Sequence, residues 1–139
     1  FISSISVHPT FTRGQDESAP LAELEDETVE TMDEQNYGGL KVLCEQAAEE
    51  LMPGRVLHVR SGLIIGPYDP TDRFSYWPLR VARGGDYVAP VGPDMPVQVI
   101  DARDQADWIL RSISVAKTEI ISIAEVQKLT WYRSNQQNY

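Results

Sequence analysis

Tyr37 and Lys41 are the two side chains whose types and spacing most directly suggest chemistry, because they stand four residues apart in the segment from Asn36 to Glu45. Residues at i and i+4 of a helix project from the same face, so a phenol and an ammonium at this spacing can reach one pocket. A nearby cation stabilises a phenolate relative to the neutral phenol. A tyrosine tuned in this way can exchange a proton with a substrate hydroxyl or carbonyl group. Helices also carry such pairs by chance, so the surrounding elements decide what the pair means.

A strand–helix–strand unit is the predicted framework for this pair. Residues 1–7 are apolar and β-branched, which is typical of the end of a buried strand. A helix is expected from residue 33 or 34 to residue 52, with Gly54 as its stop signal. Its apolar stripe consists of Leu40, Leu43, Ala47 and Leu51. Residues 55–60 read as a second strand, so we expect parallel pairing through a right-handed crossover.

Polar residues before the helix admit two interpretations. Ser3, Ser4 and Ser6 lie at or near the carboxyl end of the first strand, where open α/β sheets place ligand-binding groups. The same serines can instead satisfy backbone groups as the strand becomes a loop. Residues 9–36 form a polar loop whose part from 16 to 34 carries acids and no Lys or Arg. Such acids can bind a divalent metal or a cationic ligand, but a solvated acidic loop is commoner, because the spacing of a calcium loop is absent.

Two glycines stand in the first turns of the predicted helix, Gly38 and Gly39. Each costs about 1 kcal/mol relative to Ala. Close approach of another backbone or of a flat cofactor would explain them, and a ragged helix start explains them equally well. His58 lies in the second strand and is read as a structural residue.

The segment from residue 67 to residue 96 is rich in Pro, Gly, Asp and aromatic residues. It can fold over a cleft and offer Arg73 to an anionic or carbonyl group, or it can pack as an ordinary loop. A short helix over 79–83, a strand over 97–100 and a further helix are expected next, the last with Asp101 as N-cap.

From residue 114 the pattern of apolar residues becomes less regular and suits a helix or a strand. The apolar residues there are Ile120, Ile121, Ile123, Val126 and Leu129.

Composition limits the class of protein. The 139 residues, of which 42% are hydrophobic, make one globular domain or a piece of a larger one. A net charge of −9 argues against nucleic acids and anionic membranes as partners. Cys44 is the single cysteine, which excludes an internal disulfide and suits a reducing cytoplasm, the expected location. No metal is expected, since no Cys/His metal spacing exists, and no run of about 18 apolar residues predicts a membrane span.

Three blocks of the sequence together resemble the extended short-chain dehydrogenase/reductase family, the NAD-dependent epimerase/dehydratase group. Residues 1–8 resemble the family's strand S-S-x-x-V-Y, with His8 in place of the usual Tyr. Tyr37 to Lys41, followed by Glu45, resembles the Y-x-x-x-K helix. Residues 60–67 resemble R-P-G-x-x-Y-G-P, and residues 101–106 resemble D-x-R-D-x-A. Each block alone is weak evidence for the family, but the order and spacing of the blocks over residues 1–113 are specific to it.

The resemblance implies a role for each matching position. Ser4 would hydrogen-bond the reacting oxygen, Tyr37 would be the general acid/base, and Lys41 would hold the cofactor ribose and favour the Tyr37 phenolate. Backbone near Ser61, which stands where the family often has Pro, would meet the nicotinamide end of NAD or NADP. Arg73 and Leu63 are candidate substrate contacts.

Two positions depart from the members that act on nucleotide sugars. Leu63 and Val97 are apolar where those members often carry Asn and Arg. This favours a smaller or more apolar carbonyl or hydroxyl compound as substrate.

The resemblance implies an α/β fold with a partial Rossmann-like parallel sheet and the start of a small C-terminal lobe. Residues 1–66 would be the second half of the NAD(P)-binding domain, residues 67–113 a substrate-binding or lid portion, and residues 114–139 an atypical tail. The family's glycine-rich turn G-x-G-x-x-G is absent, and the usual residues of the family's strand after residue 113 are not visible in the tail. We therefore expect a C-terminal fragment of an NAD(P)-dependent oxidoreductase, epimerase or dehydratase. The alternative is a non-catalytic fragment or binding module without dinucleotide affinity, and homodimer formation stays open.

Overall fold

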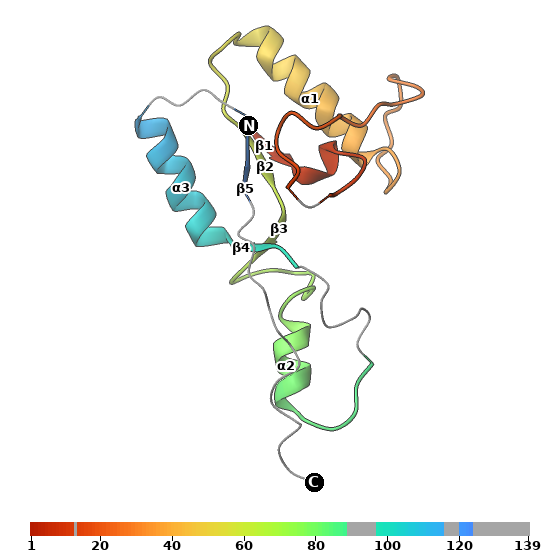
Figure 1. The fold of residues 1–139 in the computed structure, drawn as a ribbon, viewed down its shortest axis with the longest axis vertical. Coiled ribbons are helices and arrows are strands. Elements are labelled where there is room, and N and C mark those ends of the chain that lie inside the picture. The colour runs from red at the N-terminus through yellow and green to blue at the C-terminus, as the bar shows by residue number, and fades with distance from the viewer. Residues whose placement is uncertain (13, 89–96, 116–119, 124–139) are drawn as a thin grey trace.

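The computed structural model describes residues 1–12, 14–88, 97–115 and 120–123. The elements follow one another along the chain as shown in Figure 1: β1 (Ile2–Ser4), the 3₁₀ helix η1 (Ile5–Val7), α1 (Tyr37–Leu51), β2 (His58–Ser61), β3 (Leu63–Ile65), α2 (Tyr76–Ala82), β4 (Val99–Asp101), α3 (Ala102–Ser114) and β5 (Ile120–Ile123).

The described strands form two small sheets in which every pairing is parallel. One sheet has three strands in the order β1–β2–β5, and the other pairs β3 with β4. Because β1 and β2 are parallel neighbours separated in sequence by α1, the predicted crossover is confirmed. The sheet register sets Ser4 opposite Ser61 at the carboxyl ends of β1 and β2.

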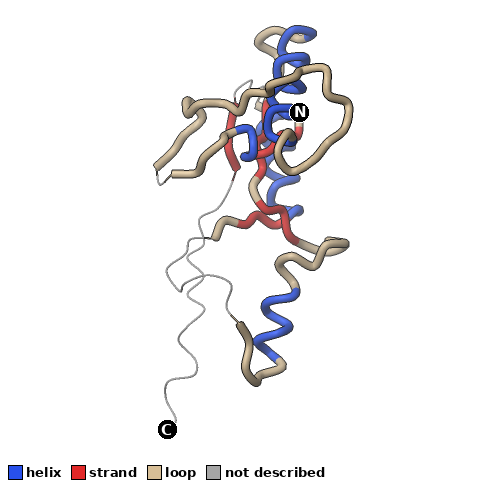
Figure 2. Tube along the Cα trace, turned by 90° about the vertical axis from the view of Figure 1, so that its right-hand side faces the viewer, coloured by secondary structure: helices blue, strands red, loops and turns tan. Residues whose placement is uncertain are grey.

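Helices lie on both sides of the strands. Figure 1 shows α1 and α3 on opposite sides of the three-stranded sheet, while α2 stands beyond the carboxyl ends of β1 and β2. Figure 2, turned by 90°, shows the same separation between α2 and the sheet. The apolar core of the described residues is small and consists of Val7, Val42, Val56, Leu57, Val59, Val99 and Ile100.

Helix α1 begins later than predicted and buries a different face. It starts at Tyr37, because the Asp33 carboxylate accepts backbone hydrogen bonds from Gln35 and Asn36 and holds a turn before the helix. The predicted end is right within one residue. The residues that α1 buries are Gly38, Gly39, Val42 and Glu45, whereas Leu51 of the predicted apolar stripe is 83% exposed.

The two glycines of α1 allow close approach of the chain's own segments. A Cβ at Gly38 would lie 2.1 Å from the Ser6 carbonyl oxygen, and a Cβ at Gly39 would lie 2.6 Å from the Leu24 Cγ. The Ala22 amide also donates to the Val7 carbonyl at 2.7 Å, so the acidic loop is tied to η1, which packs against the start of α1. Close packing therefore explains these glycines, and protein atoms cover this face.

The remaining elements match the predictions with small shifts. Strands β2 and β4 begin later than expected, at His58 and Val99. Helix α2 begins earlier, at Tyr76, and is followed by Gly84 in a left-handed conformation (φ +67°). Asp101 caps α3 as predicted, since its carboxylate accepts from the Arg103 amide at 2.8 Å.

The sequence left helix and strand both open after residue 113, and the structure has a strand there. Residues 120–123 form β5, which pairs in parallel with β2 from His58↔Ile120 to Ser61↔Ile123. Ile120, Ile121 and Ile123 thus belong to a strand, and Val126 and Leu129 lie outside the described residues. The β-branched isoleucines suit a strand, but without the motif's usual residues the sequence pattern did not decide between strand and helix. No helix within the described ranges is long and apolar enough to cross a membrane.

Candidate functional site at the carboxyl edge of the sheet

Ser4 lies at the point where β1 becomes η1. Its Oγ accepts a hydrogen bond from the Ser6 amide at 3.1 Å and thereby caps the 3₁₀ helix. This is the local backbone role that the sequence allowed for the serines. The hydroxyl hydrogen is not consumed by this bond, because a serine can donate and accept at once. Ser4 can therefore cap η1 and still donate to a ligand at the edge of the sheet.

Ser61 lies opposite Ser4 on β2 and is bound to α3. Its Oγ accepts from the Gln105 Nε2 at 2.6 Å, and both side chains are buried. The Gln105 Oε1 has no hydrogen-bond partner among the described residues. The Ser61 side chain thus fastens α3 to the sheet, and backbone near Ser61 remains the part of this residue proposed to meet a ligand.

The structure places Tyr37 at the first position of α1 and Lys41 one turn later. The Lys41 Nζ donates to the Ile2 carbonyl at 3.2 Å and lies 5.3 Å from the centre of the Phe1 ring. The Tyr37 hydroxyl makes no hydrogen bond within the described residues, so no direct bond joins the phenol to the ammonium. Tyr37 and Lys41 both lie at the end of α1 that faces β1, but the Lys41 ammonium contacts β1 and not the Tyr37 hydroxyl.

The Lys41 contact lies on the free edge of β1. The Phe1 amino group donates to the Leu57 carbonyl and the Phe1 carbonyl accepts from the Val59 amide, which directs the backbone groups of residue 1 toward β2. Backbone groups of successive residues in a strand point in opposite directions, so those of Ile2 face away from β2. The ammonium therefore satisfies a carbonyl that has no strand partner in the described part of the chain.

A buried ion pair beneath this edge was not predicted from the sequence. Arg60, which is 1% exposed, donates from Nε and NH2 to the two Glu45 carboxylate oxygens at 3.0 and 2.7 Å. A third guanidinium nitrogen lies 3.3 Å from the His8 Nε2, and the His8 Nδ1 lies 3.1 Å from the Pro20 carbonyl oxygen. Because Arg60 can only donate, His8 accepts at Nε2 and carries its hydrogen at Nδ1. The network joins β2, α1, the end of η1 and the acidic loop.

Opposing effects set the charge of Glu45. Burial raises the pKa of the Glu45 carboxyl, but the hydrogen bonds from Arg60 and its positive charge outweigh burial, so that the pKa is lowered. Glu45 is therefore ionised at neutral pH and balances the buried charge of Arg60.

Arg73 and Leu63 lie away from the serines. The Arg73 Nε donates to the Thr71 hydroxyl at 3.0 Å in the exposed loop before α2. In the same loop, hydrogen bonds from Thr71 lower the pKa of Asp69. Leu63 pairs with Val99 in the small sheet. Neither residue is brought to Ser4 by a contact in the described part of the chain.

Within residues 1–12, 14–88, 97–115 and 120–123, no group of His, Cys, Asp or Glu side chains is arranged to hold a metal ion. His58 is buried, and its Nε2 lies 3.5 Å from a Glu49 carboxylate oxygen. Its ring also meets the Phe1 ring edge-on. These contacts agree with the structural role expected for His58.

The Arg60–Glu45–His8 network and Gln105 are the residues that sequence reasoning missed. Glu45 and Arg60 both stand in the blocks that carry the resemblance, and the predicted crossover sets α1 against β2. Opposite charges at facing positions of a helix and a buried strand were therefore the available signal for the ion pair. No comparable signal marked Gln105.

Comparison with known proteins finds a similarity of fold. A search of solved structures matches the crystal structure of a putative epimerase from Burkholderia cenocepacia J2315, with a TM-score of 0.61 and 20% sequence identity. The match covers 88% of this chain and 39% of that chain, so this chain spans about two fifths of the length of its neighbour. Neither a protein-family model nor a curated protein sequence matches the chain.

At 20% identity the likeness bears on the fold alone. The mixed α/β arrangement with parallel strands, together with this neighbour, is consistent with a Rossmann-like fold. The described chain is thus similar in fold to part of an epimerase-like protein.

Proposed function

We propose that this chain carries the nicotinamide-facing part of an NAD(P)-dependent oxidoreductase site of the epimerase/dehydratase type. The parallel pairing of β1 and β2 supports this most strongly, because it sets Ser4 opposite Ser61 at the carboxyl edge of the sheet. Ligands of open α/β sheets bind outside that edge. Tyr37 and Lys41 lie on the helix that connects these two strands, and the Lys41 ammonium contacts β1 itself.

The residues fit one end of a dinucleotide. Lys41 has three N–H donors, and the Ile2 carbonyl accepts one of them, so two remain for the hydroxyls of a ribose. Ser4 keeps a free hydroxyl hydrogen, as described above. The sequence has no G-x-G-x-x-G turn for the diphosphate, so the fit concerns only the nicotinamide riboside end.

Each residue has a distinct role in the proposed reaction. The nicotinamide group, when bound, exchanges a hydride with the substrate carbon that bears the reacting oxygen. Ser4 donates a hydrogen bond to that oxygen and orients it. Tyr37 gives a proton to the same oxygen or takes one from it. Lys41 holds the ribose through the N–H donors that the Ile2 carbonyl leaves free.

Titration of the purified chain with NADH and with NADPH, followed by nicotinamide fluorescence, tests this proposal. Saturable binding of either cofactor is expected. Lys41→Ala should lower the affinity at least tenfold, because it removes the ribose donors, whereas Tyr37→Phe should keep binding and abolish hydride exchange. Arg103→Gln on α3 serves as a matched control, since it removes an exposed positive charge elsewhere. Failure of the unaltered chain to bind either cofactor would refute the proposal for this chain.

A second candidate function is a non-catalytic binding module without dinucleotide affinity. Two observations favour it: the Lys41 ammonium is engaged by β1 rather than bonded to Tyr37, and the sequence lacks the glycine-rich turn. Under this alternative Lys41 stabilises the free edge of β1. Lys41→Ala would then lower the melting temperature and leave cofactor fluorescence unchanged.

A homodimer through α1 is the proposed protein partnership. The carboxyl end of this helix leaves apolar side chains exposed, with Leu51 and the C-cap residue Met52 83% and 46% exposed. A second copy of the same helix would cover these side chains. Sedimentation of Leu51→Glu against the unaltered chain tests this, and an unchanged monomer mass for both would contradict it.

A further inference from the structure

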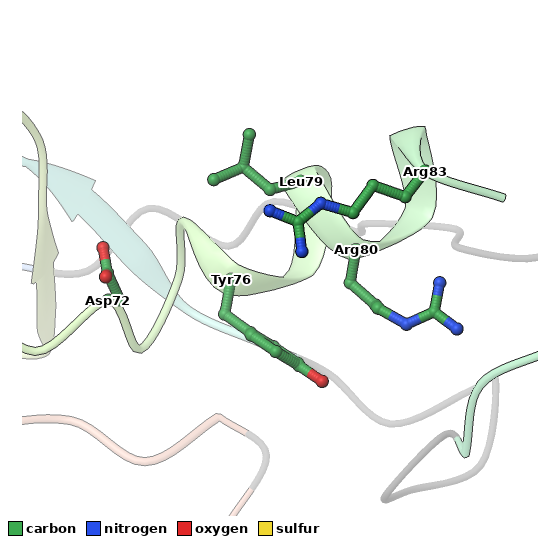
Figure 3. Close-up of a pocket in the computed structure, with 5 residues that line it drawn as sticks. All are labelled: Asp72, Tyr76, Leu79, Arg80 and Arg83. Carbon is green, nitrogen blue, oxygen red and sulfur yellow. The ribbon is translucent and has the colours of Figure 1, made fainter.

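The described part of the chain also contains a small hollow beside α2. It has a volume of about 170 Å³ and is lined by Asp72, Tyr76, Leu79, Arg80 and Arg83. Figure 3 shows these side chains around the helix, with Asp72 at one end and the two arginines at the other. Tyr76, Leu79, Arg80 and Arg83 follow the spacing i, i+3, i+4, i+7, which places them on one face of a helix.

The two arginines of the hollow differ in what they already bind. Arg80 donates from NH1 to the Gly84 carbonyl at 2.7 Å and from NH2 to the Asp86 carbonyl, and its guanidinium lies 5.6 Å from the centre of the Tyr87 ring. These contacts fix the Arg80 side chain, which forms one side of the hollow. The Arg83 guanidinium makes no hydrogen bond or ion pair with any described residue. Figure 3 shows its side chain running back along α2 toward Leu79.

The charge and lining of the hollow favour a small ligand that carries a carboxylate. Two arginines against one aspartate give a local excess of positive charge in a chain whose net charge is −9. A free guanidinium pairs with a carboxylate through two parallel hydrogen bonds. Asp72 at the opposite end repels a doubly charged phosphate more than a singly charged carboxylate. Half-exposed Tyr76 and Leu79 supply an apolar wall for a short carbon chain.

The volume limits the size of the ligand. Sites for drug-sized molecules enclose about 300–1,000 Å³. A hollow of about 170 Å³ is too small for a nucleotide and suits a molecule of a few carbon atoms. This agrees with the apolar residues Leu63 and Val97 at the two positions where nucleotide-sugar enzymes often carry polar ones.

We infer that the α2 hollow binds the carboxylate of a small organic acid, with Arg83 as its principal ligand. Figures 1 and 2 show α2 apart from the three-stranded sheet whose edge carries Ser4, so this carboxylate site is separate from the proposed oxidoreductase site. The binding of the carboxylate itself does not depend on the cofactor.

The test uses acetoacetate and its uncharged amide, acetoacetamide, as probes. Titration of the ¹⁵N-labelled chain should shift the amide signals of α2 with acetoacetate, and the amide should bind at least tenfold more weakly. Arg83→Gln should weaken acetoacetate binding at least tenfold. Arg83→Lys keeps the positive charge but cannot form two parallel hydrogen bonds with the carboxylate. Its affinity for acetoacetate should lie between that of the unaltered chain and that of Arg83→Gln. Arg103→Gln removes an exposed charge from α3, away from the hollow, and should bind as the unaltered chain does.

Equal binding of acid and amide, or undiminished binding by Arg83→Gln, would overturn the inference. The inference would also be overturned if acetoacetate shifted signals uniformly over the chain and Arg83→Gln left these shifts unchanged. A parallel titration with NADH separates this inference from the proposed function. Acetoacetate binding without NADH binding supports the carboxylate site and refutes the oxidoreductase. NADH binding without Arg83-dependent acid binding supports the oxidoreductase and refutes the carboxylate site.

Discussion

Three segments meet at the Arg60 guanidinium, and two of them supply its partners. Glu45 comes from α1, His8 from the end of η1, and the strand that carries Arg60 lies at the centre of the sheet. A guanidinium buried to this degree is tolerable only because the carboxylate pairs with it through two hydrogen bonds. This ion pair holds α1, and with it Tyr37 and Lys41, against the sheet.

Glu45→Gln should therefore destabilise the chain more than a typical substitution. The amide leaves the buried Arg60 charge unbalanced, and loss of one partner of a buried ion pair costs about 3–5 kcal/mol. Urea unfolding of the two proteins at pH 7 measures the difference. Glu50→Gln, on the exposed part of the same helix, provides the control and should change the stability by less than about 0.5 kcal/mol.

The pH dependence of this difference follows from the lowered pKa of Glu45. A carboxyl whose pKa is lower in the folded state than its ordinary value of 4.5 contributes stability above that value. The contribution is lost as the pH falls through the folded-state pKa. The gap between the unaltered chain and Glu45→Gln should thus be largest near pH 7 and shrink below pH 4.5. A gap that stays constant down to acid unfolding would contradict the role given to the ion pair.

Sequence reasoning reached the residues of the site more easily than their contacts. Ser4, Ser61, Tyr37 and Lys41 were predicted from the family resemblance, and the parallel pairing that sets Ser4 opposite Ser61 was predicted from the strand–helix–strand order. The Lys41 bond to the Ile2 carbonyl could not be foreseen, because it depends on which backbone groups the edge of β1 leaves unpaired.

At the scale of elements, α1 shows how local packing overrides an apolar pattern. The stripe from Leu40 to Leu51 predicted one buried face, but the helix turns its glycines and Glu45 inward. Only a residue without a Cβ lets the Ser6 carbonyl come as close as it does to Gly38. The position of the acidic loop against the helix start therefore depends on these glycines.

Gly38→Ala and Gly39→Ala form a matched pair that tests this. Each substitution gains about 1 kcal/mol of helix propensity. At Gly38 the new Cβ would lie 2.1 Å from a backbone oxygen, which cannot move without shifting η1, so we expect a net loss of about 1–3 kcal/mol. At Gly39 the contact is the flexible Leu24 side chain, and we expect little net change. Equal effects of the two substitutions in thermal unfolding would contradict the proposed packing.

The strands were predicted in part, for reasons that differ between them. Strand β2 was indicated by its β-branched and apolar residues. Strand β5 was missed, although its isoleucines fit a strand, because its pairing with β2 is a long-range contact that no local signal marks. The prediction that Asp101 caps α3 was confirmed, because this cap is a local interaction within three residues.

At the scale of the whole molecule, the described chain is a small fold with much apolar surface left exposed. The three-stranded sheet has β1 at its edge, where Phe1 and Ile2 are 42% and 47% exposed. Only seven apolar residues of the described ranges are buried. A core of this size contributes little free energy against the conformational entropy that folding costs.

Marginal stability is the expected consequence. Differential scanning calorimetry of the chain should show a broad transition at low temperature, with self-association that grows with protein concentration. A sharp, reversible transition of a monomer, unchanged over a tenfold range of concentration, would contradict this expectation.

The central claim is that the carboxyl edge of β1 and β2, with the start of α1, binds the nicotinamide riboside end of a dinucleotide. Reduced nicotinamide mononucleotide tests it most directly, because this compound lacks the adenosine half and the diphosphate that a glycine-rich turn would bind. Titration of the chain should enhance and saturate nicotinamide fluorescence, with at least tenfold weaker binding by Lys41→Ala and unchanged binding by Arg103→Gln. Absence of saturable binding by the unaltered, folded chain would contradict the account.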